Sequence, residues 1–205
     1  VFCQHFGLEK LPDTNNTIIP YRIFGTTEIL EYERYLTINL FTRKDLPQSA
    51  KDDRIRDSLL ELFKNVVDHT SCDRIYTCGQ YFPKSRMLFF TIVDMGETIP
   101  YNVTKYYNTL HELEAPENHL EWAIQSGTTT SMEEKPRGLG LFLIKDFVLQ
   151  NKGSFFIVSG YENYEINKSK EKFKQLEHSF PGTIVTVGFN LNNTSSYDDN
   201  NTIEF

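Results

Sequence analysis

Apolar residues recur with helical spacing between Ser49 and His69. At about 100 degrees per residue they form one broad face, which comprises Ile55, Leu59, Leu62, Phe63 and Val66. Glu61, Asn65 and Asp68, at spacing i, i+4 and i+7, line up on the opposite side. The pattern predicts an amphipathic helix whose polar stripe is either a solvated surface or a set of short oxygen-bearing groups suited to a metal ion or a water molecule.

Two segments after this helix have the composition of strands. Arg74 to Phe82 predicts a strand followed by a turn at Pro83 to Ser85. Met87 to Val93 is a near-continuous apolar run of strand length. Such a run is typical of a central strand that is covered on both faces.

The part of the chain before the helix is less regular. Residues 1 to 20 carry Gly, Pro and an Asn-Asn-Thr cluster, which indicates an irregular entry segment. Tyr21 to Phe24 and Tyr35 to Phe41 are rich in aliphatic and aromatic residues, and we expect both to be strands, with a helical turn from Glu28 to Arg34 between them.

The part after Pro100 changes in character. Residues 101 to 137 are polar and weakly patterned, with one short helix expected around Asn118 to Gln125, and such a long insertion is typical of a functional lid. Gly138 then opens an apolar helix that runs to about Gln150 and that Asn151-Lys152-Gly153 ends.

Two final strands are expected, Ser154 to Ser159 and Thr183 to Leu191, with the charged stretch from Glu162 to His178 as a long exposed hairpin connection. The pattern thus divides the chain into an N-terminal extension (1–48), a main domain (49–191) and a frayed tail rich in Asn, Ser and Asp (192–205). The extension is an extra β-structure, a partner-binding arm or the remnant of an upstream region.

Composition excludes several classes of function. With 205 residues and 39% hydrophobic content, the chain can bury one good core. A net charge of -7 without a Lys/Arg block argues against nucleic acid or an anionic membrane as the main partner. Three cysteines without a CxxC pair predict neither a disulfide framework nor a zinc site, and no apolar run is long enough to span a membrane, so a cytoplasmic protein is expected.

Three constellations carry candidate chemistry. Besides the polar stripe of the helix, Asp94-x-Gly96 follows a buried strand, where a carboxylate can accept a hydrogen bond from an amino group and a glycine lets the backbone approach a flat ring. The third is Gly138-Leu139-Gly140-Leu141 at a helix N-terminus, where free N–H groups favour phosphate oxygens. Each motif alone is a weak signal of function, whereas the order and spacing of the three motifs together are more specific than any one of them.

In this order the motifs resemble those of the GHKL ATP-binding superfamily, which includes gyrase, MutL, ninety-kilodalton heat-shock chaperones, histidine kinases and anti-sigma-factor kinases. Five segments carry the resemblance. They are Glu61 to Thr70 (similar to the N box), Asp94 to Pro100 (G1 box), Trp122 to Thr129 (lid), Arg137 to Leu141 (G2 box) and Pro181 to Val187 (the final "GT" strand).

The resemblance covers roughly residues 50 to 191 and implies the fold of that superfamily. This Bergerat-type ATP-binding fold is an α/β (α+β) two-layer sandwich, in which a mixed, largely antiparallel sheet is covered on one face by helices. Residues 101 to 137 would then be the ATP lid.

The resemblance also implies a site for ATP and Mg²⁺. Asn65 would ligate Mg²⁺, and Glu61 sits where hydrolytic members keep the carboxylate that activates water. Asp94 would bind the adenine amino group. The remaining implied nucleotide-binding residues are Asp68 and Gly96 on the adenine side, Thr183 near the adenine, and Gly138, Leu139, Gly140 and Leu141 at the lid hinge.

Some positions depart from the family pattern or imitate another motif. Thr98 replaces the second glycine of the G1 box, and Val66 replaces the alanine that commonly follows the N-box Asn. His111 to Pro116 resembles the phosphoacceptor box of a histidine kinase, but it falls inside the lid and not on a dimerisation helix before the ATP domain.

The resemblance is greatest to stand-alone members, which implies two functions. The first is an enzyme that hydrolyses ATP or transfers its γ-phosphoryl group to a regulatory partner protein, with Glu61 as general base. The alternative is a nucleotide-gated interaction module with little turnover. A homodimer stays open in either case.

Overall fold

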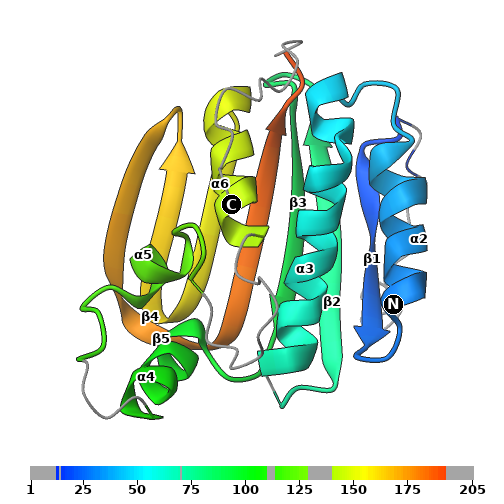
Figure 1. The fold of residues 1–205 in the computed structure, drawn as a ribbon. Helices are drawn as coiled ribbons and strands as arrows, with labels where there is room; N and C mark the ends of the chain where they lie inside the picture. The colour runs from blue at the N-terminus through cyan, green and yellow to red at the C-terminus, as the bar shows by residue number, and fades with distance from the viewer. Residues whose placement is uncertain (1–12, 14, 70, 110–113, 129–139, 193–205) are drawn as a thin grey trace.

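The computed structural model describes residues 13, 15–69, 71–109, 114–128 and 140–192, which form an α+β fold around a five-stranded sheet (Figure 1). Its strands are β1 (Ile18–Gly25), β2 (Arg74–Phe82), β3 (Met87–Asp94), β4 (Ser154–Asn167) and β5 (Lys170–Asn190). Its α-helices are α2 (Ile29–Leu36), α3 (Asp53–His69), α4 (Ile99–Thr109), α5 (His119–Ala123) and α6 (Gly140–Asn151). Within these ranges, no helix combines the length and the apolar character that crossing a membrane requires.

The strand order is β1-β2-β3-β5-β4, and every described pair of neighbouring strands is antiparallel. The expectation of a mixed sheet is therefore wrong for the described strands. Two tight hairpins, β2-β3 and β4-β5, account for two of the four pairs, because a strand joined to its neighbour by a short turn must run back antiparallel to it. The other two pairs, β1-β2 and β3-β5, join strands that helices separate in the chain.

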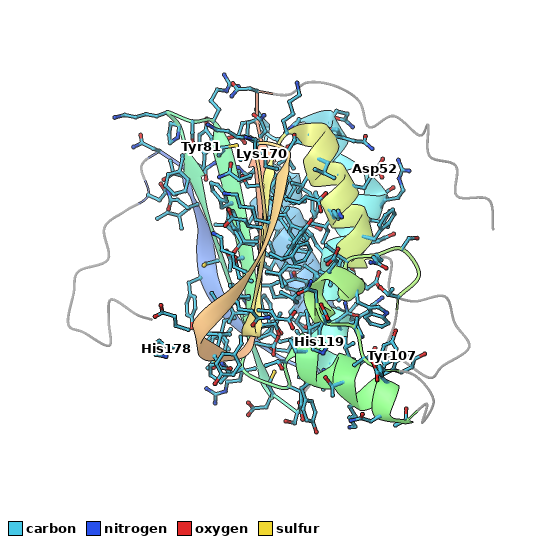
Figure 2. All side chains as sticks on the ribbon, turned by 90° about the vertical axis from the view of Figure 1, so that its left-hand side faces the viewer. Asp52, Tyr81, Tyr107, His119, Lys170 and His178 are labelled. Carbon is cyan, nitrogen blue, oxygen red and sulfur yellow. The ribbon has the colours of Figure 1, made fainter. Side chains whose placement is uncertain are left out.

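Within the part of the chain that the structure describes, the middle strand β3 is covered by helices on one face only, whereas coverage on both faces was predicted. Its residues alternate between buried and half-buried, and the buried ones (Leu88, Phe90, Ile92 and Asp94) point toward the helices. The described helices lie on one side of the sheet (Figure 2). The apolar run from Met87 to Val93 therefore leaves half of its side chains on the other side.

The segment from Tyr35 to Phe41 is helical and not a strand. Helix α2 continues into a π-helical turn over Thr37–Phe41, and its buried residues have helical spacing (Tyr32, Tyr35, Leu36 and Leu40). The ring of Tyr32 stacks on Phe63 of α3 with 4.7 Å between centroids. Packing against α3 outweighs the β propensity of these aromatic residues, and it joins β1 and α2 to the core of the main domain.

The helix predicted from Ser49 to His69 is interrupted once. A 3-10 turn spans Gln48–Lys51, and α3 begins after Asp52, whose carboxylate accepts the backbone N–H of Arg54 at 2.9 Å. Asp52 thus acts as the N-cap.

The predicted end of α6 is confirmed. Gly153 donates its N–H to Val148 at 2.9 Å in a Schellman arrangement, although the left-handed residue is Lys152 (φ 53°) and not the glycine.

The predicted hairpin after α6 is confirmed, but both strands extend through the charged stretch. The register shifts on either side of Gly160, and there the hairpin bends (Figure 1). Its far half turns back beside α6, where Lys145 pairs with Glu171 at 2.9 Å.

Candidate functional site

The candidate site is centred on the end of β3. Asp94 is the last residue of the strand, only 3% exposed, and stands opposite Thr183 in the β3–β5 register. Gly182 precedes Thr183 with φ 146°, and a Cβ there would stand 2.1 Å from the Asp94 carbonyl oxygen. The two strands therefore approach closely at the point where the buried carboxyl lies, and only glycine fits beside it.

The buried position changes the acidity of Asp94. Burial raises its pKa to about 6, and the nearby Glu97 carboxylate adds to the rise. Backbone hydrogen bonds from Gly96, at 3.0 Å, and from Thr183 act in the opposite direction. At neutral pH the site therefore holds a desolvated carboxylate, ready to accept a donor.

Ser159 is a buried residue of this site that sequence reasoning missed. Its hydroxyl lies 2.9 Å from that of Thr183 and accepts the backbone N–H of Ile99, the first residue of α4, at 2.8 Å. It thus ties β4, β5 and α4 together beside Asp94. A single serine within an apolar strand gives no sequence signal for such a role.

The second part of the site joins α3 to α6. A Cβ on Gly140 would stand 2.9 Å from Glu61 Oε2 and 3.2 Å from Glu61 Cβ, so the half-buried side chain of Glu61 packs directly against the first residue of α6. The structure thus brings together the predicted general base and the predicted glycine turn. It also shows that Glu61 lies on a flank of α3 that faces α6, and not on a fully solvated stripe.

The other two residues of the polar stripe, Asn65 and Asp68, differ in how far they are exposed. Asn65 is half-buried, and its carboxamide has no hydrogen-bond partner among the described residues. Asp68 is exposed. Glu97 connects this end of α3 to the loop after β3, because its carboxylate accepts the backbone N–H of Ser71, which also holds the pKa of Glu97 below its usual range.

The predicted phosphate-binding turn is described only in part. Gly140 and Leu141 form the start of α6, with Leu141 half-buried against the core. Gly138 and Leu139 lie outside the described residues, as do His111 of the phosphoacceptor-like box and residues 129 to 137 of the predicted lid.

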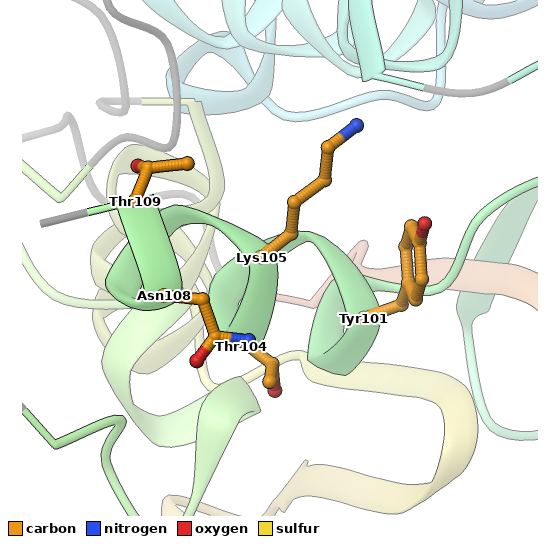
Figure 3. Close-up of a pocket in the computed structure, with 5 residues that line it drawn as sticks. All are labelled: Tyr101, Thr104, Lys105, Asn108 and Thr109. Atoms are coloured by element: carbon orange, nitrogen blue, oxygen red, sulfur yellow. The ribbon is translucent and has the colours of Figure 1, made fainter. Parts of the chain in front are cut away.

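Helix α4 was not predicted, and it borders a pocket. Pro100 stands in the first turn of α4, where its missing N–H costs nothing. The pocket, of about 400 Å³, is lined by Tyr101, Thr104, Lys105, Asn108 and Thr109 (Figure 3). None of the predicted site residues lines it, but the Lys105 charge is close enough to Glu97 to help lower the pKa of that carboxyl.

A hydrogen-bonded chain holds α4 and α5 on the hairpin. The ring of His119 contacts Glu162 at 2.6 Å through Nδ1 and Thr104 at 3.1 Å through Nε2. The second oxygen of Glu162 accepts the backbone N–H of Leu120 at 2.9 Å. The described part of the predicted lid is therefore anchored on β4.

The oxygen-bearing side chains of the site suit a magnesium ion that takes most of its coordinating atoms from a bound molecule and not from the protein. The described residues contain no cluster of three His, Cys, Asp or Glu side chains. Mg²⁺ commonly takes one or two protein oxygens and completes its shell with phosphates and water. The carboxamide of Asn65, which has no hydrogen-bond partner within the described part of the chain, fits that mode of binding.

Comparisons of the chain with models of protein families, with curated proteins and with solved structures found no match. The function is therefore argued from the residues of the site.

Proposed function

We propose that the chain binds ATP with Mg²⁺ in a Bergerat-type site like that of the GHKL superfamily. One observation carries the proposal: the buried Asp94 carboxyl stands in register with Thr183 at the end of β3. These residues belong to two motifs distant in sequence, and a nucleotide site of this type requires them side by side.

The chemistry of Asp94 favours adenine. A desolvated carboxylate gains most from a ligand that donates a hydrogen bond, and the exocyclic amino group of adenine is such a donor. The Thr183 hydroxyl lies beside it, held by Ser159 at 2.9 Å. Guanine presents a carbonyl oxygen at the corresponding position, which the carboxylate would repel.

The phosphates need positive charge, because Glu61, Asp94 and Glu97 make the site acidic. The first turn of α6 offers free backbone N–H groups, and Lys105 offers an exposed ammonium group beside the pocket on α4. The Asn65 carboxamide oxygen would hold Mg²⁺, which when bound neutralises phosphate charge.

Glu61 determines which of the two functions applies. As a general base it would take a proton from the water that attacks the γ-phosphoryl group, or from the hydroxyl of a partner protein. Its contact with Gly140 supports a second function, in which the side chain sets the position of α6 and the chain works as a nucleotide-gated module.

Titration calorimetry with ATP and GTP tests the binding proposal. We expect Mg²⁺-dependent ATP binding, GTP binding at least about tenfold weaker, and a loss of about tenfold or more in ATP affinity for Asp94→Asn, because a charge-assisted hydrogen bond is lost. Asp57→Asn, the same change at an exposed position of α3, should bind as the wild type does. Equal binding of ATP and GTP, or no binding, would refute the adenine site.

Phosphate release by the wild type and by Glu61→Ala separates the two functions. Retained ATP binding with lost turnover in Glu61→Ala supports the general base. A wild type that binds ATP but releases no phosphate supports the module, and in that case Glu61→Ala should alter only the position of α6.

A further inference from the structure

One side of the sheet faces away from every described helix (Figure 2). We call it the open face and define it by the outward residues of the three central strands. These are Tyr76, Cys78, Gln80 and Phe82 on β2, Met87, Phe89, Thr91 and Val93 on β3, and Ile184, Thr186 and Gly188 on β5. Ile18, Tyr21 and Ile23 of β1 and Phe156 and Val158 of β4 continue it at the two sides.

The composition of the open face is unlike that of a solvated sheet surface. Antiparallel sheets with one solvated face alternate apolar with polar residues, yet this face is mostly aliphatic and aromatic. Arg74, the exposed outward residue at the start of β2, lies at the margin of this face, and none of the residues named above is Asp, Glu, Lys or Arg, although charged residues make up 24% of the chain. The hydroxyls of Thr91 and Thr186, the most central polar pair, bond each other at 2.9 Å.

The face is also shaped to receive side chains. A hollow of about 550 Å³ lies over β1, β2 and β3, with Tyr21, Phe82 and Phe89 on its walls. Tyr21 is 46% exposed and Phe82 is 49% exposed. Large contiguous apolar surfaces of this kind mark interaction sites.

We propose that the open face is the interface of a two-fold homodimer, in which the sheets of two copies pack face to face. Charge supports a second copy as the occupant. A chain with net charge -7 repels its own copy over most of its surface, and the open face is where two copies can meet without opposing like charges. Packed sheets of this kind form about 10 Å-thick apolar layers between inner faces.

One of the two edges of the described sheet is unsuited to pairing with another strand. This edge is β1, which carries Pro20 and a register shift between Ile19 and Arg22, and the other edge is β4. A proline and a bulge both disfavour pairing with another strand. Two copies are therefore disfavoured from joining their sheets edge to edge through β1.

The area is sufficient for a stable dimer. Five strands at about 4.8 Å spacing and about 27 Å length cover roughly 650 Å² in each copy. Two copies would together bury about 1,300 Å², which exceeds the roughly 1,000 Å² expected of a specific interface.

Light scattering coupled to size-exclusion chromatography tests the proposal, with Phe82→Glu and Tyr21→Glu as interface variants. We expect the mass of two chains for the wild type at about 50 µM, which is above the dissociation constant of a typical standard-size interface, and the mass of one chain for either variant. Both side chains are half exposed in a single copy, so neither change should prevent folding, which circular dichroism checks.

Leu30→Glu is the matched control, because Leu30 on α2 is 73% exposed and lies away from the open face. It should remain dimeric. A second measurement follows Cys78, which lies on the open face: its labelling by a maleimide should slow as protein concentration rises through the dimer range.

A wild type of one-chain mass at all concentrations would overturn the proposal, whether or not another protein or a detergent then covers the face. A dimer that survives both interface variants, or that Leu30→Glu dissociates, would overturn it as well.

Discussion

Gly140 lies directly against Glu61, because a Cβ added to Gly140 would stand 2.9 Å from Oε2 of the Glu61 carboxylate. The first residue of α6 and the middle of α3 are thus fitted to each other. The two nearest atoms, Oε2 and Cδ, belong to the flexible end of the side chain, so an added methyl group would move the carboxylate, while the Cβ of Glu61 at 3.2 Å requires the helices to shift by only a few tenths of an ångström.

Gly140→Ala should therefore impair function more than stability. We expect the free energy of unfolding to change by less than about 1 kcal/mol, since alanine favours a helix and offsets the contact. If Glu61 is the general base, phosphate release should fall as far as in Glu61→Ala. The double variant should lose no more than either single variant, because both act on the same carboxylate. Wild-type turnover in Gly140→Ala would show that the position of Glu61 does not matter.

Asp94 should make the protein less stable as pH rises from about 4 to about 6. Its pKa is 3.8 in an ordinary environment and about 6 in the fold, so the folded state holds the proton over this range and the unfolded state loses it. The stabilisation is complete below about pH 4 and is lost above about pH 6, with a total near 3 kcal/mol.

Urea unfolding of the wild type and of Asp94→Asn at a series of pH values measures this effect. The difference between the two curves isolates Asp94 from other carboxylates, such as Asp52, whose pKa is lowered by Arg54 and which therefore acts in the opposite sense. Asp94→Asn should gain stability relative to the wild type above about pH 6. A difference that is constant across the range would show that Asp94 does not titrate as a buried group.

Lys105 should act on phosphates and not on adenine. Lys105→Met is expected to weaken ATP binding about tenfold, the value of one charge-assisted contact, and to leave adenosine binding unchanged. Lys84→Met, in the turn between β2 and β3 at the opposite end of β3 from Asp94, serves as the matched control. An equal loss for ATP and adenosine would place Lys105 at the base or assign it a structural role.

Gly182 should tolerate no side chain. A Cβ there would stand 2.1 Å from a backbone oxygen that cannot move freely, at a φ of 146°. We expect Gly182→Ala to cost at least about 3 kcal/mol of unfolding free energy. Gly127→Ala is the control, because Gly127 also has a positive φ (77°) but nothing within 4 Å of its Cβ position, and about 1 kcal/mol is expected. Equal melting temperatures for the two variants would contradict the close approach of β3 and β5.

The local sequence pattern was enough to predict the elements in which buried residues recur at regular intervals. The bounds of β2 follow from composition and turn residues, and the apolar face of α3 follows from its spacing, because one face of each element is buried. The same reasoning failed where a pattern has two interpretations. The segment from Tyr35 to Phe41 has the composition of a strand, but it is helical in the structure, where the helix that leads into it packs on α3 through Tyr32 and Phe63.

The features of the candidate site also divide into those predicted from the sequence and those that only the structure revealed. Residue type and order predicted Glu61, Asn65, Asp94 and Gly140 as site residues, through the motifs that their segments resemble. Only the tertiary structure placed Thr183 between Asp94 and Ser159 on neighbouring strands, and Glu61 against Gly140. Strand register and helix packing create these contacts between distant segments, and no local pattern encodes which distant residue will face which. The same holds for the open face, whose apolar residues on several strands became one surface when the sheet formed.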